Sequence, residues 1–113
     1  MKVKLKISIT NDKDEPFMGI GLVWLLQGIK KHKSINSAAK EMNLSYAKAI
    51  KILNQLEKNL GGKVITRRHG GNERYGAEIT DFGEKYIKKY DVFQKKIKKY
   101  AENEFNKLFI KNC

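Results

Sequence analysis

The sequence predicts an α+β fold, and three observations lead to this prediction. Apolar residues recur at helical spacing between residues 20 and 60, with one short turn inside that stretch. A glycine-rich, basic segment over 63–79 has the pattern of a β-hairpin. The residues after 80 carry a heptad-like apolar repeat typical of a long helix. In this order, the three features are typical of a winged helix-turn-helix domain with a long C-terminal helix.

The N-terminal residues alternate between polar and apolar side chains, as KVKLKISIT over 2–10. This period of two predicts a half-buried strand, and the polar run over 11–16 predicts a turn after it. Leu22, Leu25, Leu26 and Ile29 then form one apolar stripe and predict a helix over 20–32. We expect Trp24 to lie in the core or between elements rather than to serve as a ligand platform.

A helix-turn-helix pattern follows. Ser34 or Asn36 can cap a short helix that runs through Met42. Asn43 tolerates the left-handed backbone of a tight turn, and Ser45 can cap a further helix that runs to about residue 60. Gly61 and Gly62 would end that helix. The pattern therefore contains two helices joined by a turn of three or four residues, as in a helix-turn-helix.

The segment after this pattern predicts a hairpin and a final helix. Strands are expected over 64–66 and 75–79, around a turn at 70–73. Thr80 would cap the last helix. We therefore expect a winged helix-turn-helix domain over 1–80 and a linker or dimerisation helix over 81–113. Spacings of four and three residues define an apolar seam for dimerisation, part of which would cover the chain's own first helix: Tyr86, Tyr90, Phe93, Ile97 and Tyr100.

The charge balance indicates a polyanionic partner. The 113 residues include 24 Lys and Arg against 12 acids, which gives a net charge of +12. DNA, RNA and an anionic membrane surface all fit such an excess. The longest apolar stretch, 20–29, is too short to span a membrane. The lone Cys113 and the absence of a signal-peptide pattern favour a cytoplasmic protein.

The helix after Ser45 is predicted to read DNA. Its apolar residues share one face, so the opposite face carries lysines and amides that suit a major groove. A solvated surface is the alternative, and Tyr46 could either pack or reach a phosphate. The basic hairpin could enter a minor groove or could be a solvated turn. The candidate DNA contacts are Ser45, Tyr46, Ala47, Lys48, Lys51, Asn54 and Gln55 on the helix, with Arg67, Arg68 and Arg74 on the hairpin.

Catalysis has little support in the sequence. His32 and His69 lie far apart, and neither has a cysteine at metal-ligand spacing. No dinucleotide or phosphate-loop motif occurs, and Gly70-Gly71 is too short for a phosphate cradle. We expect no enzyme activity, no metal and no cofactor.

The run from SINSAAKEMNLSYAKAI through ITDFG resembles the N-terminal domain of the ModE family of molybdate-responsive regulators. That domain is related to the LysR-type winged helix. The resemblance covers about residues 2–92. It implies that helix 45–60 is the recognition helix, that the hairpin is the wing and that the last helix dimerises. Three residues depart from the family pattern: Lys33 replaces a helix-ending glycine, Ile50 replaces a tryptophan and Ala47 replaces a basic residue.

These observations predict a dimeric transcription regulator that binds double-stranded DNA at an inverted repeat. Because the chain ends soon after the last helix, we expect a stand-alone DNA-binding half that binds no molybdate. A protein–protein interaction module and an RNA-binding protein are the alternatives. Salt-dependent binding of duplex DNA, in competition with duplex RNA, would distinguish them.

Overall fold

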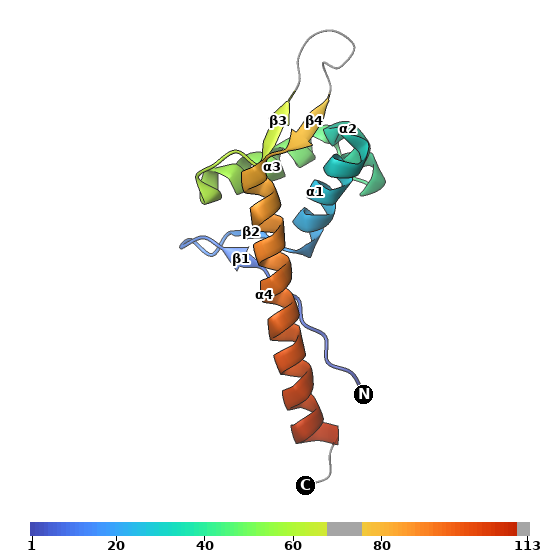
Figure 1. Cartoon of the computed structure of the whole chain (residues 1–113), viewed down its shortest axis with the longest axis vertical. Helices are drawn as coiled ribbons and strands as arrows, with labels where there is room; N and C mark the ends of the chain where they lie inside the picture. Colours follow the sequence, from blue (N-terminus) through green and yellow to red (C-terminus); the bar gives the residue numbers. More distant parts are fainter. Residues whose placement is uncertain (68–75, 111–113) are drawn as a thin grey trace.

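A computed structural model describes residues 1–67 and 76–110. Three helices and two small hairpins form a head, from which one long helix projects (Figure 1). The wing hairpin rises from the end of the head opposite to this projecting helix (Figure 1). In chain order, the elements are β1 (Ile9–Thr10), β2 (Pro16–Met18), α1 (Ile20–His32), α2 (Ile35–Glu41), α3 (Tyr46–Leu60), β3 (Ile65–Arg67), β4 (Ala77–Ile79), α4 (Asp81–Phe105) and a terminal π-helical turn (Asn106–Ile110).

The core lies where α1, α2 and α3 meet the base of the wing. Leu26, Ile29 and Ala39 have no exposed surface, and neither do Ala49 and Val64. The small side chain of Ala38 lets α1 and α2 approach closely, since a Cβ at Gly28 would lie 3.0 Å from that of Ala38. This packing confirms the apolar stripe predicted on the first helix.

Three hydroxyl side chains cap the helices as predicted. The hydroxyl oxygens of Ser34, Ser45 and Thr80 accept hydrogen bonds from backbone N–H groups at distances of 3.0–3.1 Å. Of the two candidates for the start of α2, Ser34 is therefore the cap. Each cap satisfies an N–H group that has no partner within its helix.

The turns between helices use left-handed backbone. Asn43 has φ +57° in the turn before α3, and Gly61 has φ +72° where α3 ends. Lys33 has φ +54° at the end of α1, in the position where the resemblance implies a glycine. Its carbonyl oxygen accepts a hydrogen bond from the N–H of Ala77, which ties the end of α1 to the wing.

The N-terminal strand is much shorter than predicted. Only Ile9 and Thr10 form β1, which pairs with an unpredicted strand, β2. Val3 and Leu5 are each 38% exposed, and the segment over 1–8 runs beside α4 (Figure 1). The hydroxyl of Tyr90 donates a hydrogen bond to the carbonyl oxygen of Ile7 at 2.7 Å. The alternation therefore reflects contact with a helix on one side rather than pairing in a sheet.

Two further expectations were wrong in part. Trp24 is 57% exposed on α1, so it is not a core residue. In the wing, β3 covers Ile65–Arg67 rather than 64–66, and β4 covers Ala77–Ile79 and so ends where it was predicted to end. Their register pairs Ile65 with Ile79 and Arg67 with Ala77. The predicted turn at 70–73 lies outside the described residues.

Candidate nucleic-acid interface

The front of α3 is an exposed polar surface over an apolar back. Ala49, Leu53 and Leu56 are at most 2% exposed and anchor the helix in the core. At 100° per residue, five candidate contacts project from the other side of the helix, namely Ala47, Lys48, Lys51, Asn54 and Gln55, whereas Ser45 and Tyr46 lie at its start. Ser45, Tyr46, Ala47, Lys48, Lys51 and Asn54 are exposed, and Gln55 is half-buried. The structure therefore brings all seven predicted residues of this helix to one accessible region.

The two lysines of this surface are free to contact a ligand. Among the residues that the structure describes, neither Lys48 nor Lys51 takes part in an ion pair. Tyr46 is 47% exposed in the first turn of α3, so its ring is only partly packed. Ordinary surface lysines often pair with nearby acids, and here the face nearest the helix start keeps its full positive charge.

A groove of about 630 Å³ separates α3 from the β1–β2 hairpin. Lys48, Lys51 and Gln55 line it from the helix, and Asp14 and Glu15 line it from the hairpin. Its apolar lining comes from Pro16, Phe17, Met18, Leu22 and Ile52. The front of α3 therefore has two different borders, the wing on one side and an acidic hairpin on the other.

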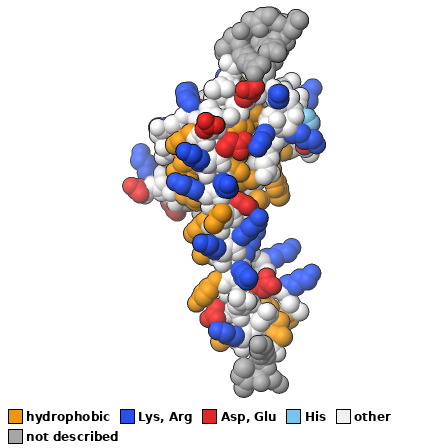
Figure 2. Space-filling model, viewed as in Figure 1, with side chains coloured by type: hydrophobic (Ala, Val, Ile, Leu, Met, Phe, Trp, Pro, Cys, Tyr) orange, Lys and Arg blue, Asp and Glu red, His pale blue; other side chains and the backbone are white. Residues whose placement is uncertain are grey.

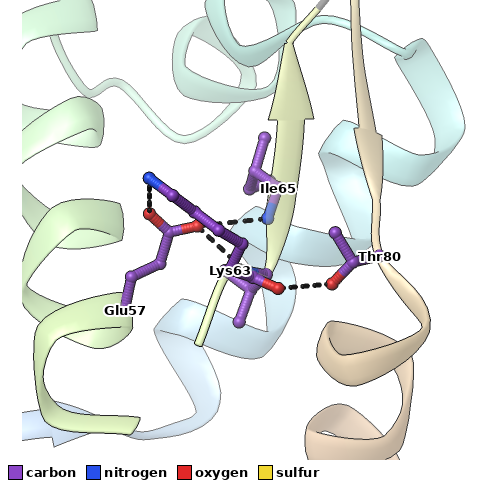
Figure 3. Close-up of polar contacts among 5 residues, drawn as sticks. Glu57, Lys63, Ile65 and Thr80 are labelled. Atoms are coloured by element: carbon purple, nitrogen blue, oxygen red, sulfur yellow. Dashed lines mark hydrogen bonds and ion pairs between the residues drawn. The ribbon is translucent and has the colours of Figure 1, made fainter. Parts of the chain in front are cut away.

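The base of the wing is fixed to α3 by a carboxylate that the sequence analysis did not single out. Glu57 Oε2 accepts hydrogen bonds from the backbone N–H of Val64 at 2.8 Å and of Ile65 at 3.3 Å (Figure 3). Its other oxygen lies 3.6 Å from Lys63 Nζ. A glutamate in the last turn of an amphipathic helix gives no local signal for this role, because its partners follow the Gly61-Gly62 turn.

Thr80 fixes the other strand of the wing. Its hydroxyl donates a hydrogen bond to the carbonyl oxygen of Lys63 at 2.6 Å (Figure 3). Its backbone N–H donates to the carbonyl oxygen of Val64 at 2.9 Å. The wing base, α3 and the start of α4 thus form one hydrogen-bonded unit, from which the exposed Arg67 projects. Arg68 and Arg74 lie outside the described residues.

The predicted seam on α4 is buried at one position and exposed at others. Tyr90 is 3% exposed, so its own chain covers it. Phe93, Ile97 and Tyr100 are 41–63% exposed, and Tyr86 is partly buried. Phe82, which the sequence analysis omitted, lies four residues before Tyr86 and is 37% exposed. Apolar side chains lie between lysines along the visible face of α4 (Figure 2).

Neither a metal site nor a membrane span emerges from the described part of the chain. Over residues 1–67 and 76–110, no group of three or more His, Cys, Asp or Glu side chains could hold a metal ion. None of the helices in those ranges is both long and apolar enough to cross a bilayer. His32 instead pairs with Glu41 at 2.6 Å, and this contact lowers the pKa of the Glu41 carboxyl.

The family of the chain is established by its sequence. The model of the lysR family of bacterial regulatory helix-turn-helix proteins matches residues 23–84, more than half of the chain. The chain belongs to this family. The matched segment includes most of α1, all of α2 and α3, and the strands of the wing, which carry the geometry described above. Family membership confirms the interpretation as a DNA-binding transcription regulator.

A curated relative supports the resemblance to the ModE family. The molybdenum-pterin-binding protein MopB of Rhodobacter capsulatus is 36% identical over 77 residues, which make up 68% of this chain. The chain spans only 28% of the length of MopB. The expectation that this chain binds no molybdate stays a prediction, as does the division at residue 80.

Solved structures share the fold. The CbnR_DBD–DNA complex has a TM-score of 0.59 and 17% identity, and the likeness covers 77% of this chain and 94% of that one. CbnR itself, a LysR family transcriptional regulator, has a TM-score of 0.57 and 17% identity, with coverage of 79% and 29%. These likenesses confirm the predicted α+β winged helix-turn-helix with a long C-terminal helix.

Proposed function

We propose that this protein regulates transcription without catalysis by inserting α3 into the major groove of double-stranded DNA. The observation that carries the proposal is the front of α3, where unpaired lysines and amides project from a helix whose back is anchored in the core. An α-helix with such a face fits a major groove about 12 Å wide. The protein would act in the cytoplasm, where a bacterial regulator meets its target.

The side chains of α3 divide the work of recognition. Asn54 lies on the flank of the front face and can form two hydrogen bonds with an adenine. Lys51 can reach a guanine or a phosphate. Lys48 and Gln55 would contact DNA on the side of α3 that faces the β1–β2 hairpin. The start of α3 would lie closest to the DNA backbone, where a phosphate accepts hydrogen bonds from N–H and hydroxyl groups. The residues at this position are Ser45, Tyr46 and Ala47.

The wing would provide the second contact. Arg67 leaves β3 at the point where the strand runs toward the tip of the wing. We propose that it enters the adjacent minor groove together with Arg68 and Arg74, where the negative potential is strongest when the groove is narrow. Because Glu57 and Thr80 fix the base of the wing, its direction relative to α3 is set before DNA binds.

Two copies would bind an inverted repeat. A single winged helix contacts one short half-site, which limits affinity and specificity. The exposed seam on α4 offers a surface on which a second copy can pack around a two-fold axis. The two recognition helices would then occupy half-sites separated by about one helical turn or a multiple of it.

Salt-dependent binding of duplex DNA tests the proposal. Each phosphate neutralised adds a slope of about −0.9 to log K against log salt. Lys51→Ala should weaken binding, and a base contact would cost about 1–3 kcal/mol of discrimination at one position. Lys98→Ala on α4 removes the same charge away from α3, and it serves as the matched control. An affinity for duplex DNA that does not change with salt concentration would support a protein–protein interaction module. A preference for duplex RNA would support an RNA-binding protein.

A further inference from the structure

The β1–β2 hairpin brings negative charge to the border of the recognition surface. Asp14 and Glu15 line the same groove as Lys48 and Lys51 of α3. With Asp12, they place three of the chain's 12 acids in one turn, which contains a single lysine, Lys13. In a chain of net charge +12, this acidic turn therefore borders the helix that is proposed to read DNA.

Hydrogen bonds of Asn11 order this turn and hold the carboxylate of Glu15. Asn11 Oδ1 accepts hydrogen bonds from the N–H groups of Lys13 at 2.9 Å and Glu15 at 3.0 Å. Asn11 Nδ2 donates to Glu15 Oε1 at 3.1 Å. Asp14 adopts φ +66°, a left-handed conformation that its short side chain tolerates. These contacts therefore define the backbone that carries Asp14 and the position of the Glu15 side chain.

Neither carboxylate neutralises the lysines across the groove. Within residues 1–67 and 76–110, no ion pair includes Asp14 or Glu15. The charges on both sides of the groove therefore remain available to attract or repel a charged ligand. At a separation near the Debye length, about 8–10 Å at 0.1–0.15 M salt, a carboxylate still repels a phosphate.

We propose that Asp14 and Glu15 form an electrostatic barrier that limits how DNA can dock on α3 and so favours target DNA over random DNA. The inference rests on the proposed function. Lysines spread over the head and α4 attract a duplex in many orientations. A duplex that slides toward the hairpin brings its phosphates against the barrier, whereas a duplex docked on the wing side avoids it. Specificity then comes from a repulsive element as well as from attractive contacts.

The test compares two variants with the same change of charge. Asp14→Asn with Glu15→Gln keeps the turn, because Asn tolerates φ +66° and Gln retains an acceptor for Asn11. Glu102→Gln with Glu104→Gln on α4 is the matched control. The probes are a random-sequence duplex of about 20 base pairs and the tightest duplex of that length selected from a random library.

Removal of the barrier should raise affinity for the random duplex about three- to tenfold at low salt and affinity for the selected duplex at most about twofold. The gain should shrink as salt rises. The control should raise both affinities by one common factor. Equal gains on the two duplexes, or no difference from the control, would overturn the barrier while leaving DNA binding intact. Failure of the unmodified protein to bind any duplex would overturn the proposed function and the barrier with it.

Discussion

The carboxylate of Glu57 accepts a hydrogen bond from the backbone N–H of Val64 at 2.8 Å. Val64 is fully buried, and in the chain it lies between α3 and β3, the first strand of the wing. Its N–H group would have no water to bond if the carboxylate were removed. This side chain of α3, together with Thr80, thus fixes the base of the wing, and the angle between the two proposed DNA contacts depends on both.

Glu57→Ala should therefore reduce both stability and DNA binding. A buried N–H group left without a partner costs about 1–3 kcal/mol. Glu57→Gln keeps one acceptor and should cost less. Urea denaturation gives the stability of each variant, and DNA titration gives its affinity. Equal stability of the Ala variant and the unmodified protein would show that the contact does not stabilise the fold.

Gly83 should resist replacement although it lies inside a helix. An added Cβ would lie 2.7 Å from the carbonyl oxygen of Val64 and 2.9 Å from Ile79 Cγ2. Gly83→Ala should therefore destabilise the protein by about 1–3 kcal/mol, against the usual helix preference for alanine. Gly21 in α1 has no heavy atom within 4 Å of the corresponding position. Gly21→Ala should stabilise the protein by about 0.5–1 kcal/mol. Thermal melts of the two variants should shift in opposite directions.

Lys33 pays a conformational cost that glycine would remove. A left-handed residue with a Cβ destabilises the folded chain by about 1–2 kcal/mol. Glycine removes this strain, but it also raises the conformational entropy of the unfolded chain, which offsets about 0.4–1 kcal/mol of the gain. Lys33→Gly should therefore stabilise the protein by up to about 1 kcal/mol. Asn43→Gly is the control, because asparagine tolerates its φ of +57°. A destabilised Lys33→Gly variant would show that the lysine side chain has a stabilising contact.

Tyr90 should hold the N-terminal segment to α4. Tyr90→Phe removes the donor to Ile7 and should cost about 0.5–1.5 kcal/mol. Burial raises the pKa of the phenol above its ordinary value of 10.0. The unfolded chain then ionises first, so the stability from the neutral phenol is present below pH 10.0 and is lost as pH rises toward the raised pKa. Denaturation curves measured across this pH range give the free energy of unfolding. It should fall more steeply with pH for the unmodified protein than for Tyr90→Phe.

The helices were predictable because local chemistry determines them. Ser34, Ser45 and Thr80 begin helices through their own hydroxyl groups, and Asn43 and Gly61 mark turns through their backbone preferences. The polar front of α3 follows from helical periodicity alone. Each of these signals lies within a few residues of the structure that it forms.

The failures concern contacts between distant residues. An alternating segment looks the same whether a strand or a helix covers its apolar side, so the contact between Tyr90 and Ile7 could not be foreseen. Trp24 satisfies the helical pattern, yet no other described element covers it enough to bury it. Glu57 acts on residues beyond a turn whose geometry the sequence leaves open.

The last prediction concerns the seam on α4. Phe82, Tyr86, Phe93, Ile97 and Tyr100 lie within about 60° of one another around the helix. Three of these side chains are 41–63% exposed, and full burial of one such side chain contributes about 1.5–3 kcal/mol. About half of that remains for each side chain, or about 4–9 kcal/mol for three side chains in each of two copies, before the cost of association, so a weak dimer of micromolar affinity at best is expected.

Phe93→Ser with Ile97→Ser should therefore give a folded monomer that binds an inverted repeat much more weakly than the unmodified protein. Val92→Ser is the control, because Val92 is 47% exposed but points about 100° away from Phe93. It should leave the dimer intact. Sedimentation at about tens of micromolar protein measures assembly, a concentration chosen for micromolar affinity. If the unmodified protein sediments as a monomer there, the seam does not pair, and each head would then have to recognise its half-site alone.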